Sequence, residues 1–168
     1  TLLQDRAGFH EAIESVAAPF VDQDIELVVG IESRGFIFGS AIADRLGAGF
    51  APVRKPGKLP STTVRANYDL EYGKDALEIH DDAVQRGQRV LIVDDLLATG
   101  GTAKAASGCP GTNGDLIVRN QTTPFLGNAN FVTQLGGDVR GLAFLIELVG
   151  LKGRDKLAGH RLHTVLKY

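Results

Sequence analysis

Apolar residues near the start of the chain recur three or four positions apart, and shorter apolar runs follow them. The first pattern covers Gln4 to Phe20 and predicts an amphipathic helix. Leu27 to Ile31 is short and almost wholly apolar, which is typical of a parallel strand covered on both faces. Gly35 to Leu46 returns to helical spacing and is followed by Gly47, a residue suited to a helix C-terminus. The chain is thus predicted to begin with a helix, a strand and a second helix.

Strand-like and helix-like segments continue to alternate later in the chain. Further strands are predicted at residues 50–53, 62–68, 76–80, 89–93, 142–146 and 162–166. The strands at 62–68 and 76–80 are expected to pair as a β-ribbon, and a short basic helix is predicted at 151–157. The alternation predicts an α/β fold in one domain over residues 1–168, with a mainly parallel twisted sheet flanked by helices and a flexible β-ribbon as a lid.

The composition changes over Ser107 to Asn130, where glycine, asparagine and proline accumulate. A helix that begins at Thr102 runs into Pro110, which stops it. Helical spacing resumes over Phe131 to Leu135 and ends at a pair of glycines. We interpret residues 107–130 as an insert that splits one helix and leaves the domain as a surface loop, with residues 116–118 forming a small strand of their own.

Charge and composition narrow the classes of function. The 168 residues include 18 Lys and Arg and 20 Asp and Glu, which gives a net charge of −2. This balance argues against a basic face that binds nucleic acid. No apolar run reaches the roughly 18 residues that a membrane span requires, and a single cysteine, Cys109, suits a reducing compartment. We therefore expect a cytoplasmic protein with no nucleic-acid or membrane partner.

The most informative segment is Val90 to Thr102, with the sequence VLIVDDLLATGGT. An apolar strand delivers Asp94 and Asp95 at its carboxyl end, where α/β sheets hold their ligands. Both carboxylates are suited to accept hydrogen bonds from sugar hydroxyls or to hold a hydrated Mg²⁺. The plain alternative is an acidic turn and a helix cap without a ligand. The residues predicted to surround a phosphate with backbone N–H groups and hydroxyls are Ala98, Thr99, Gly100, Gly101 and Thr102.

This segment resembles the phosphoribosyl-pyrophosphate signature of the type I phosphoribosyltransferases. Four further blocks are similar to those of the adenine phosphoribosyltransferases and occur in the same order, at residues 29–36, 54–60, 68–74 and 147–154. The resemblance covers residues 1–106 and 131–168. It implies a type I phosphoribosyltransferase-like fold and a homodimer. It also implies a purine-salvage transferase that forms AMP and pyrophosphate from adenine and 5-phosphoribosyl 1-pyrophosphate, with Mg²⁺ as cofactor.

The resemblance also implies roles for individual residues. It places the ribose 5-phosphate on residues 98–102, and the ribose and Mg²⁺ beside the acidic pair. It assigns Ser33 and Arg34 to a turn that contacts the pyrophosphate, with a cis peptide bond between Glu32 and Ser33. The further candidates for pyrophosphate binding are Arg54, Lys55, Lys58 and His80. Without the resemblance, the basic residues from position 54 onward would be interpreted as a solvent-exposed loop.

Glu71 and Tyr72 lie between the two predicted ribbon strands, beside Gly73, a residue suited to a hinge. This arrangement fits a lid that closes over the ribose and excludes water from a hydrolysable intermediate. We expect both residues to be catalytic, with Glu71 handling the proton of the purine. The alternative is a hairpin tip whose carboxylate faces solvent.

Two departures from the family pattern leave other functions open. The family has a further segment before the position of Thr1, and that segment forms part of its adenine pocket. It also has only a short connection where this chain has residues 107–130. The alternatives are a noncatalytic regulator that binds phosphoribosyl pyrophosphate, and an inactive or engineered fragment of the enzyme. The Glu71 lid motif and the lack of an attached DNA-binding helical domain favour the enzyme.

Overall fold

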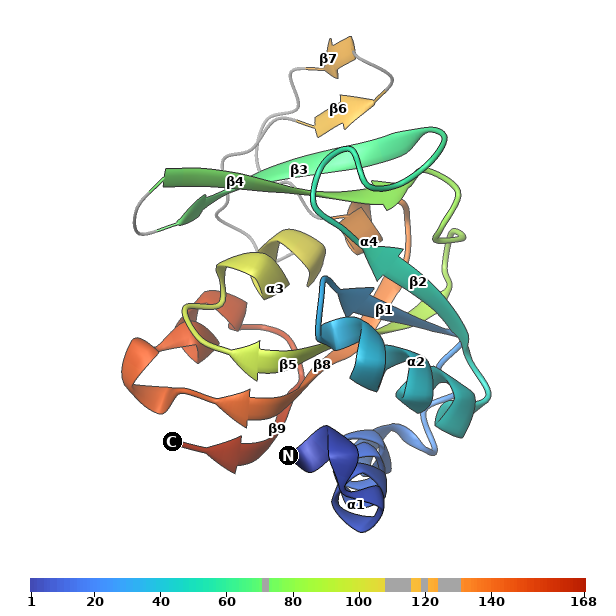
Figure 1. Cartoon of the computed structure of the whole chain (residues 1–168). Coiled ribbons are helices and arrows are strands. Elements are labelled where there is room, and N and C mark those ends of the chain that lie inside the picture. Colours follow the sequence, from blue (N-terminus) through green and yellow to red (C-terminus); the bar gives the residue numbers. More distant parts are fainter. Residues whose placement is uncertain (71–72, 108–115, 119–120, 124–130) are drawn as a thin grey trace.

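A five-stranded sheet with the strand order β2-β1-β5-β8-β9 forms the centre of the protein (Figure 1). The computed structural model describes residues 1–70, 73–107, 116–118, 121–123 and 131–168. Every neighbouring pair in the sheet is parallel, which confirms the mainly parallel sheet predicted from the apolar runs. The strands are β1 (Leu27–Ile31), β2 (Gly49–Val53), β5 (Arg89–Leu97), β8 (Asp138–Glu147) and β9 (Leu162–Lys167).

Alternate residues of the central strands belong to two separate clusters of buried side chains. In β1, Val29 packs in one cluster and Val28 in the other. In β5, Ile92 and Leu91 are divided in the same way. Because successive side chains of a strand point to opposite faces, a sheet covered on both faces needs apolar residues at every position. This requirement accounts for the nearly uniform apolar runs in the sequence.

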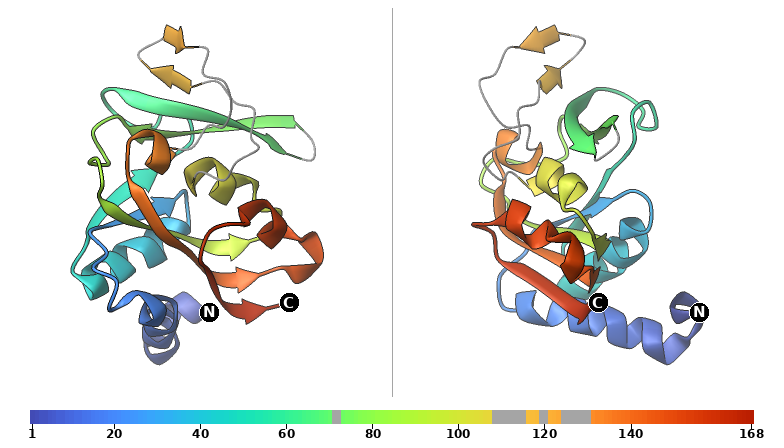
Figure 2. Two further views of the ribbon diagram at one scale, coloured as in Figure 1. Left: turned by 180° about the vertical axis from the view of Figure 1, so that it is seen from behind. Right: turned by 90° about the vertical axis from the view of Figure 1, so that its left-hand side faces the viewer.

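Helices from the first part of the chain cover one face of the sheet (Figure 2). They are η1 (Leu2–Gln4), α1 (Arg6–Ala17), η2 (Ala18–Phe20) and α2 (Gly35–Leu46), where η marks a 3₁₀ turn. The first helix is therefore shorter than predicted, and it begins where the Asp5 carboxylate accepts a hydrogen bond of 2.6 Å from the Gly8 amide. The second helix has the predicted bounds, and Gly47 ends it with a φ of 67°. None of the helices in the described part of the chain is long and apolar enough to cross a membrane.

The opposite face of the sheet is covered by helices and by an antiparallel ribbon. These elements are β3 (Thr63–Leu70), β4 (Gly73–His80), α3 (Gly101–Ser107), α4 (Phe131–Gln134) and η4 (Gly153–Leu157). The ribbon confirms the predicted pairing. The short basic helix predicted at 151–157 is confirmed in part, because η4 is a 3₁₀ helix over residues 153–157 whereas Leu151 belongs to a separate 3₁₀ helix, η3 (Val149–Leu151). Lys152 divides them with a φ of 52°, in the left-handed region that a helix cannot continue through.

The segment interpreted as an insert contributes two described strands, β6 (Leu116–Val118) and β7 (Gln121–Thr123). The small strand predicted at 116–118 is confirmed, but it does not stand on its own. It pairs with β3 and extends the ribbon to a four-stranded antiparallel sheet in the order β4-β3-β6-β7. On the two sides of this segment, α3 and α4 are in contact, and the Thr133 hydroxyl donates a hydrogen bond of 3.1 Å to the Ser107 carbonyl. Ser107 belongs to α3, so the interruption begins after it.

The order of the strands reverses between β1 and β5. β2 lies on one side of β1, and the next central strand in the chain, β5, lies on the other side. In open α/β sheets, ligands bind outside the carboxyl ends of the strands at such a reversal. Residues 32–34 follow β1, and β5 ends in residues 94–97. The fold therefore brings two sets of predicted site residues to the same edge of the sheet.

Candidate active site

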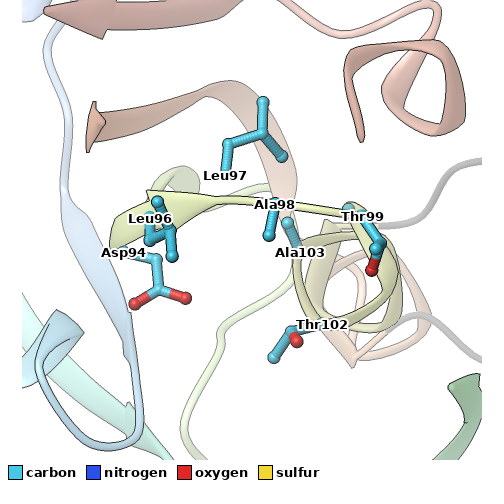
Figure 3. A pocket seen from close by; sticks show the side chains of 8 residues that line it. Asp94, Leu96, Leu97, Ala98, Thr99, Thr102 and Ala103 are labelled. Carbon is cyan, nitrogen blue, oxygen red and sulfur yellow. The ribbon is translucent and has the colours of Figure 1, made fainter. Parts of the chain in front are cut away.

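The connection between β5 and α3 surrounds an open pocket (Figure 3). Gly100 allows the chain to turn there, since its φ of 76° is one that side-chain-bearing residues rarely adopt. Its carbonyl accepts a hydrogen bond of 3.0 Å from the Lys104 amide, and Gly101 is the first residue of α3. The lining residues are Asp94, Leu96, Leu97, Ala98, Thr99, Gly100, Thr102 and Ala103. The predicted phosphate loop, residues 98–102, therefore wraps around a hollow.

Asp94 lies at the edge of this pocket in a confined position. Its Oδ1 atom accepts a hydrogen bond of 2.9 Å from the Asp95 amide. A Cβ atom added to Gly35, the first residue of α2, would lie 2.9 Å from the same oxygen. Burial, together with the neighbouring charge of Asp95, raises the pKa of Asp94 to about 8. At neutral pH the carboxyl therefore holds a proton unless a cation or a hydrogen-bond donor joins it.

An ion pair connects the ends of β1 and β5. The Nε atom of Arg34 lies 2.9 Å from Oδ2 of Asp95. The Arg34 side chain is 67% exposed and that of Asp95 is 19% exposed, so the pair is open to solvent at the rim of the site. Ser33 starts the turn into α2, where its carbonyl accepts a hydrogen bond of 3.3 Å from the Phe36 amide. The peptide bond between Glu32 and Ser33 is cis, as the resemblance implies.

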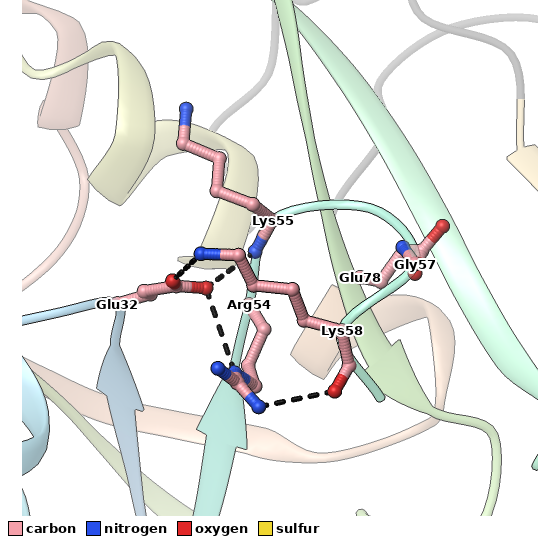
Figure 4. Close-up of polar contacts among 6 residues, drawn as sticks. All are labelled: Glu32, Arg54, Lys55, Gly57, Lys58 and Glu78. Atoms are coloured by element: carbon pink, nitrogen blue, oxygen red, sulfur yellow. Dashed lines mark hydrogen bonds and ion pairs between the residues drawn. The ribbon is translucent and has the colours of Figure 1, made fainter. Parts of the chain in front are cut away.

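Glu32 forms hydrogen bonds and ion pairs with the basic residues that follow β2 (Figure 4). Its Oε2 atom accepts a hydrogen bond of 2.8 Å from the Lys55 amide and lies 3.5 Å from Nε of Arg54. Its Oε1 atom pairs with the ammonium group of Lys58. Burial alone would raise the pKa of Glu32, but the bonds from Lys58 and Lys55 and the positive charges of Lys58 and Arg54 lower it overall. Glu32 is therefore ionised and holds three basic residues at the carboxyl end of β1.

The basic loop, residues 54–58, is also fastened to itself and to the ribbon. The Arg54 guanidinium donates a hydrogen bond of 3.0 Å to the Lys58 carbonyl. The Gly57 amide donates one of 2.9 Å to Oε2 of Glu78, a residue of β4. The loop is thus fixed by hydrogen bonds, whereas the sequence without the resemblance suggests a solvent-exposed loop. The role of Glu32 was missed, although its position one residue beyond a strand that borders β5 is a signal that could have indicated it.

The remaining predicted site residues are His80, Glu71 and Tyr72. His80 is the last residue of β4 and lies opposite Thr63 of β3. The proposed catalytic residues Glu71 and Tyr72 lie outside the described residues, as does Cys109. The structure therefore brings together the acidic pair, the phosphate loop, Arg34 and the basic loop.

Comparisons with known proteins identify the family of the chain. A family profile described as the phosphoribosyl transferase domain matches residues 4–107. An adenine phosphoribosyltransferase of Clostridium perfringens is 52% identical over 168 residues, which is 100% of this chain and 85% of that protein. An adenine phosphoribosyltransferase of Acidobacterium capsulatum is 49% identical and is covered over 81% of its length by 100% of this chain.

Solved structures of similar proteins share the fold. The adenine phosphoribosyltransferase of Rhodothermus marinus superposes with a TM-score of 0.82 at 46% identity, over 99% of this chain and 83% of that chain. The Saccharomyces cerevisiae enzyme, solved with an imino-altritol bisphosphate and adenine, gives a TM-score of 0.77 at 34% identity, over 98% and 82% of the two chains. The sequence matches and the shared fold lead to one conclusion: the chain belongs to the phosphoribosyltransferase family and, within it, to the adenine phosphoribosyltransferases.

Proposed function

We propose that this chain is a purine-salvage transferase that forms AMP and pyrophosphate from adenine and 5-phosphoribosyl 1-pyrophosphate. The observation that carries the proposal is the sequence of chemical groups along the edge of the sheet. A loop of small residues with two hydroxyls lies beside two carboxylates, and a cluster of cationic side chains lies beyond them. This order matches the phosphate, ribose and pyrophosphate of the substrate.

The 5′-phosphate would bind in the pocket of the phosphate loop. The hydroxyls of Thr99 and Thr102 and the backbone N–H groups of residues 98–102 are the proposed donors, and hydrogen bonds to a charged acceptor are among the stronger ones. Gly100 allows the backbone to approach the phosphate closely. The pocket is open, so the rest of the substrate can extend toward Asp94.

The pyrophosphate would bind to cations that acidic side chains hold in the structure as described. Arg34 pairs with Asp95, and Lys58 and Arg54 pair with Glu32. A pyrophosphate group carries more negative charge than either carboxylate, so it can compete for these partners. Ser33 and Lys55 complete the proposed set, and His80 is its most distant member. On this view the acidic residues hold the cationic side chains in place until the pyrophosphate of the substrate binds those side chains instead.

The acidic pair fits a Mg²⁺ ion that arrives with the substrate. Among the described residues, no group of three or more His, Cys, Asp and Glu side chains could hold a metal by itself. Asp94 and Asp95 offer carboxylate oxygens, which Mg²⁺ prefers, and it commonly uses one or two carboxylates together with substrate phosphates. When bound, Mg²⁺ supplies positive charge to the pyrophosphate leaving group. The same carboxylates are placed to accept hydrogen bonds from the ribose hydroxyls.

In the proposed reaction a ring nitrogen of adenine forms a bond to C1 of the ribose as the bond from C1 to the pyrophosphate oxygen breaks. The ribose passes through a state with oxocarbenium character, so the residues of this chain act by positioning the reactants and stabilising charge. Arg34 and the basic loop would balance the charge that develops on the pyrophosphate. Glu71 would accept the proton that adenine loses, and Tyr72 would cover the ribose with it.

We further propose that the protein is a homodimer in the cytoplasm. Exposed apolar side chains on neighbouring elements support a contact between copies, since Ile37 on α2 is 41% exposed and Phe50 on β2 is 36% exposed. Exposed apolar side chains of this size are common in protein interfaces. Sedimentation equilibrium of the purified chain tests this assembly, and a monomer at all concentrations would contradict it.

The activity is tested by incubating the purified chain with labelled adenine, phosphoribosyl pyrophosphate and Mg²⁺. We expect labelled AMP and an equal amount of pyrophosphate. Reactions with hypoxanthine in place of adenine, and with chelator in place of Mg²⁺, are the controls and should give little product. Binding of phosphoribosyl pyrophosphate without formation of AMP would favour a noncatalytic regulator instead.

A further inference from the structure

Gly153, from a distant part of the chain, packs against Gly100 and Ala98 of the phosphate loop. A Cβ atom added to Gly153 would lie 2.1 Å from the Ala98 carbonyl oxygen and 3.0 Å from the Gly100 nitrogen. A Cβ atom added to Gly100 would lie 2.5 Å from the Gly153 carbonyl oxygen. Both distances to oxygen are far shorter than carbon and oxygen can approach without a bond. The backbone of η4 is therefore packed directly on the backbone of the phosphate loop.

The side of this contact that carries Gly153 is firmly anchored. The next residue, Arg154, donates two hydrogen bonds to Glu147, of 2.9 Å from Nε and 2.6 Å from Nη2. The Thr164 hydroxyl donates a further bond of 2.9 Å to the same carboxylate. Glu147 is only 4% exposed, and Leu157 at the end of η4 is 2% exposed and lies in the core. Bidentate Arg–carboxylate pairs of this kind fix geometry as well as adding stability.

The side that carries the phosphate loop has weaker support. The Leu97 carbonyl accepts a hydrogen bond of 2.9 Å from the Leu148 amide, but this bond lies before the loop begins. Ala98 and Thr99 are only partly buried and border the open pocket. If a side chain were added at position 153, the loop would therefore yield before η4 does.

We propose that Gly153 is a positioning residue, which sets the place of the phosphate loop through its backbone contact with Ala98 and Gly100. The proposal rests on the proposed function, in which this loop binds the 5′-phosphate of the substrate and of AMP. Gly153 touches neither ligand in this account. It acts by keeping the backbone N–H groups of the loop directed at the phosphate, and the pair of Glu147 and Arg154 holds it in place.

The experiment compares Gly153→Ala with Gly150→Ala. Gly150 lies in the adjoining turn η3, and nothing lies within 4 Å of a Cβ added there. Calorimetry should show a rise in the Kd of AMP of about 10- to 100-fold for Gly153→Ala, as for one or two lost hydrogen bonds to a charged acceptor. The Kd of adenosine, which has no phosphate, should stay within about twofold. In steady-state assays the KM for phosphoribosyl pyrophosphate should rise more than kcat falls, and Gly150→Ala should match the parent.

A folded Gly153→Ala variant with unchanged AMP affinity overturns the proposal, as does an equal loss of affinity for AMP and adenosine. Circular dichroism on heating shows whether the variant folds. If it does not fold, Glu147→Gln carries the test, because it keeps the shape of the anchor and weakens its charge. That variant should weaken AMP binding by a smaller factor and leave adenosine binding unchanged, and equal effects on both ligands contradict the proposal. A parent protein that binds AMP but forms none from adenine contradicts the proposed function alone.

Discussion

The Nε atom of Arg34 and Oδ2 of Asp95 lie 2.9 Å apart and join the ends of two strands, β1 and β5, that neighbour each other only because the strand order reverses there. Arg34 is a proposed pyrophosphate-binding residue, and Asp95 is a proposed Mg²⁺ ligand. While the two side chains are paired, neither is free to bind its own ligand. We therefore expect removal of one partner to affect the binding of pyrophosphate and of Mg²⁺ differently.

Asp95→Asn should have opposite effects on pyrophosphate binding and on turnover. Without Mg²⁺, the variant should bind inorganic pyrophosphate about two- to fivefold more tightly, because Arg34 loses a competing partner that is worth about 0.2–1 kcal/mol at an exposed site. With Mg²⁺, AMP formation should fall, because a carboxylate that aids the ribose or the metal is lost. Calorimetry with and without Mg²⁺, together with an activity assay, separates the two effects. Weaker pyrophosphate binding in the absence of metal would contradict this account.

Thr102→Ala should weaken the binding of AMP and of phosphoribosyl pyrophosphate by about 1–3 kcal/mol, as expected when one hydrogen bond to a charged acceptor is lost. Thr102→Ser retains a hydroxyl at the same place and is the matched control. Its affinity should stay close to that of the parent. Equal affinities of all three proteins would remove this residue from the phosphate site.

Glu32→Gln should loosen the basic loop. The ionised Glu32 stabilises the folded chain above its ordinary pKa of 4.5, and this contribution disappears as the pH falls through its lowered pKa. At pH 7 the variant should lose about 1–3 kcal/mol of unfolding free energy, and the difference should narrow in acid. Exchange of the Lys55 amide proton should become faster, since Glu32 is its acceptor.

Glu78→Gln is the control for this loop. Glu78 accepts from Gly57 rather than from Lys55, so the control should speed exchange at Gly57 and spare Lys55. The same change at both amides in both variants would show that the loop opens as one unit and that Glu32 has no special place in it.

The contribution of Asp94 to the stability of the metal-free protein should decrease as the pH rises toward 8. The pKa of Asp94 is raised from its ordinary 3.8 to about 8. Between these values the folded chain keeps a proton that the unfolded chain has lost, so the free energy of unfolding falls with increasing pH over this window. Asp94→Asn cannot titrate and should flatten the dependence. Urea unfolding in the presence of chelator at several pH values checks this, and parallel profiles for parent and variant would be the contrary result.

Replacing residues 108–130 with two helix-forming residues should join α3 and α4 into one helix. Closure of the long loop costs about 3 kcal/mol, and at about 2–4 °C per kcal/mol its removal should raise the Tm by roughly 6–12 °C. Scanning calorimetry of both chains measures the change. A lower Tm would mean that the pairing of β6 with β3 stabilises the domain more than loop closure destabilises it.

The parts of the fold that could be predicted are those where local pattern and tertiary context agree. α2 has its predicted bounds because helical spacing ends at Gly47, which takes up a left-handed conformation. Strands β1 and β5 were visible because burial on both faces demands apolar residues throughout. The helix predicted at 151–157 starts two residues later in the structure, because its pattern of apolar and basic residues does not reveal the left-handed conformation of Lys152.

The site divides in the same way. The phosphate loop and the acidic pair could be predicted because their residues are consecutive, so their chemistry appears within one segment. The contacts of Glu32 were harder to predict, since its partners follow β2 while Glu32 itself follows β1, and only its position beyond a strand that borders β5 pointed to the site. The contact of Gly153 with Gly100 is still less visible, because it is made by backbone atoms and leaves no side-chain signature beyond the two glycines.

The pairing of β6 with β3 changes how the ribbon can move. A hairpin of two strands is marginally stable by itself in water, whereas three or more strands can persist on their own. With β6 and β7 added, the ribbon belongs to a four-stranded sheet that is separate from the central sheet in its strand pairing (Figure 1) but shares its buried cluster through residues such as Val64 and Leu77. This sheet is therefore a stiffer cover over the core than a two-stranded hairpin would be, so β3 and β4 can keep their pairing without support from a ligand.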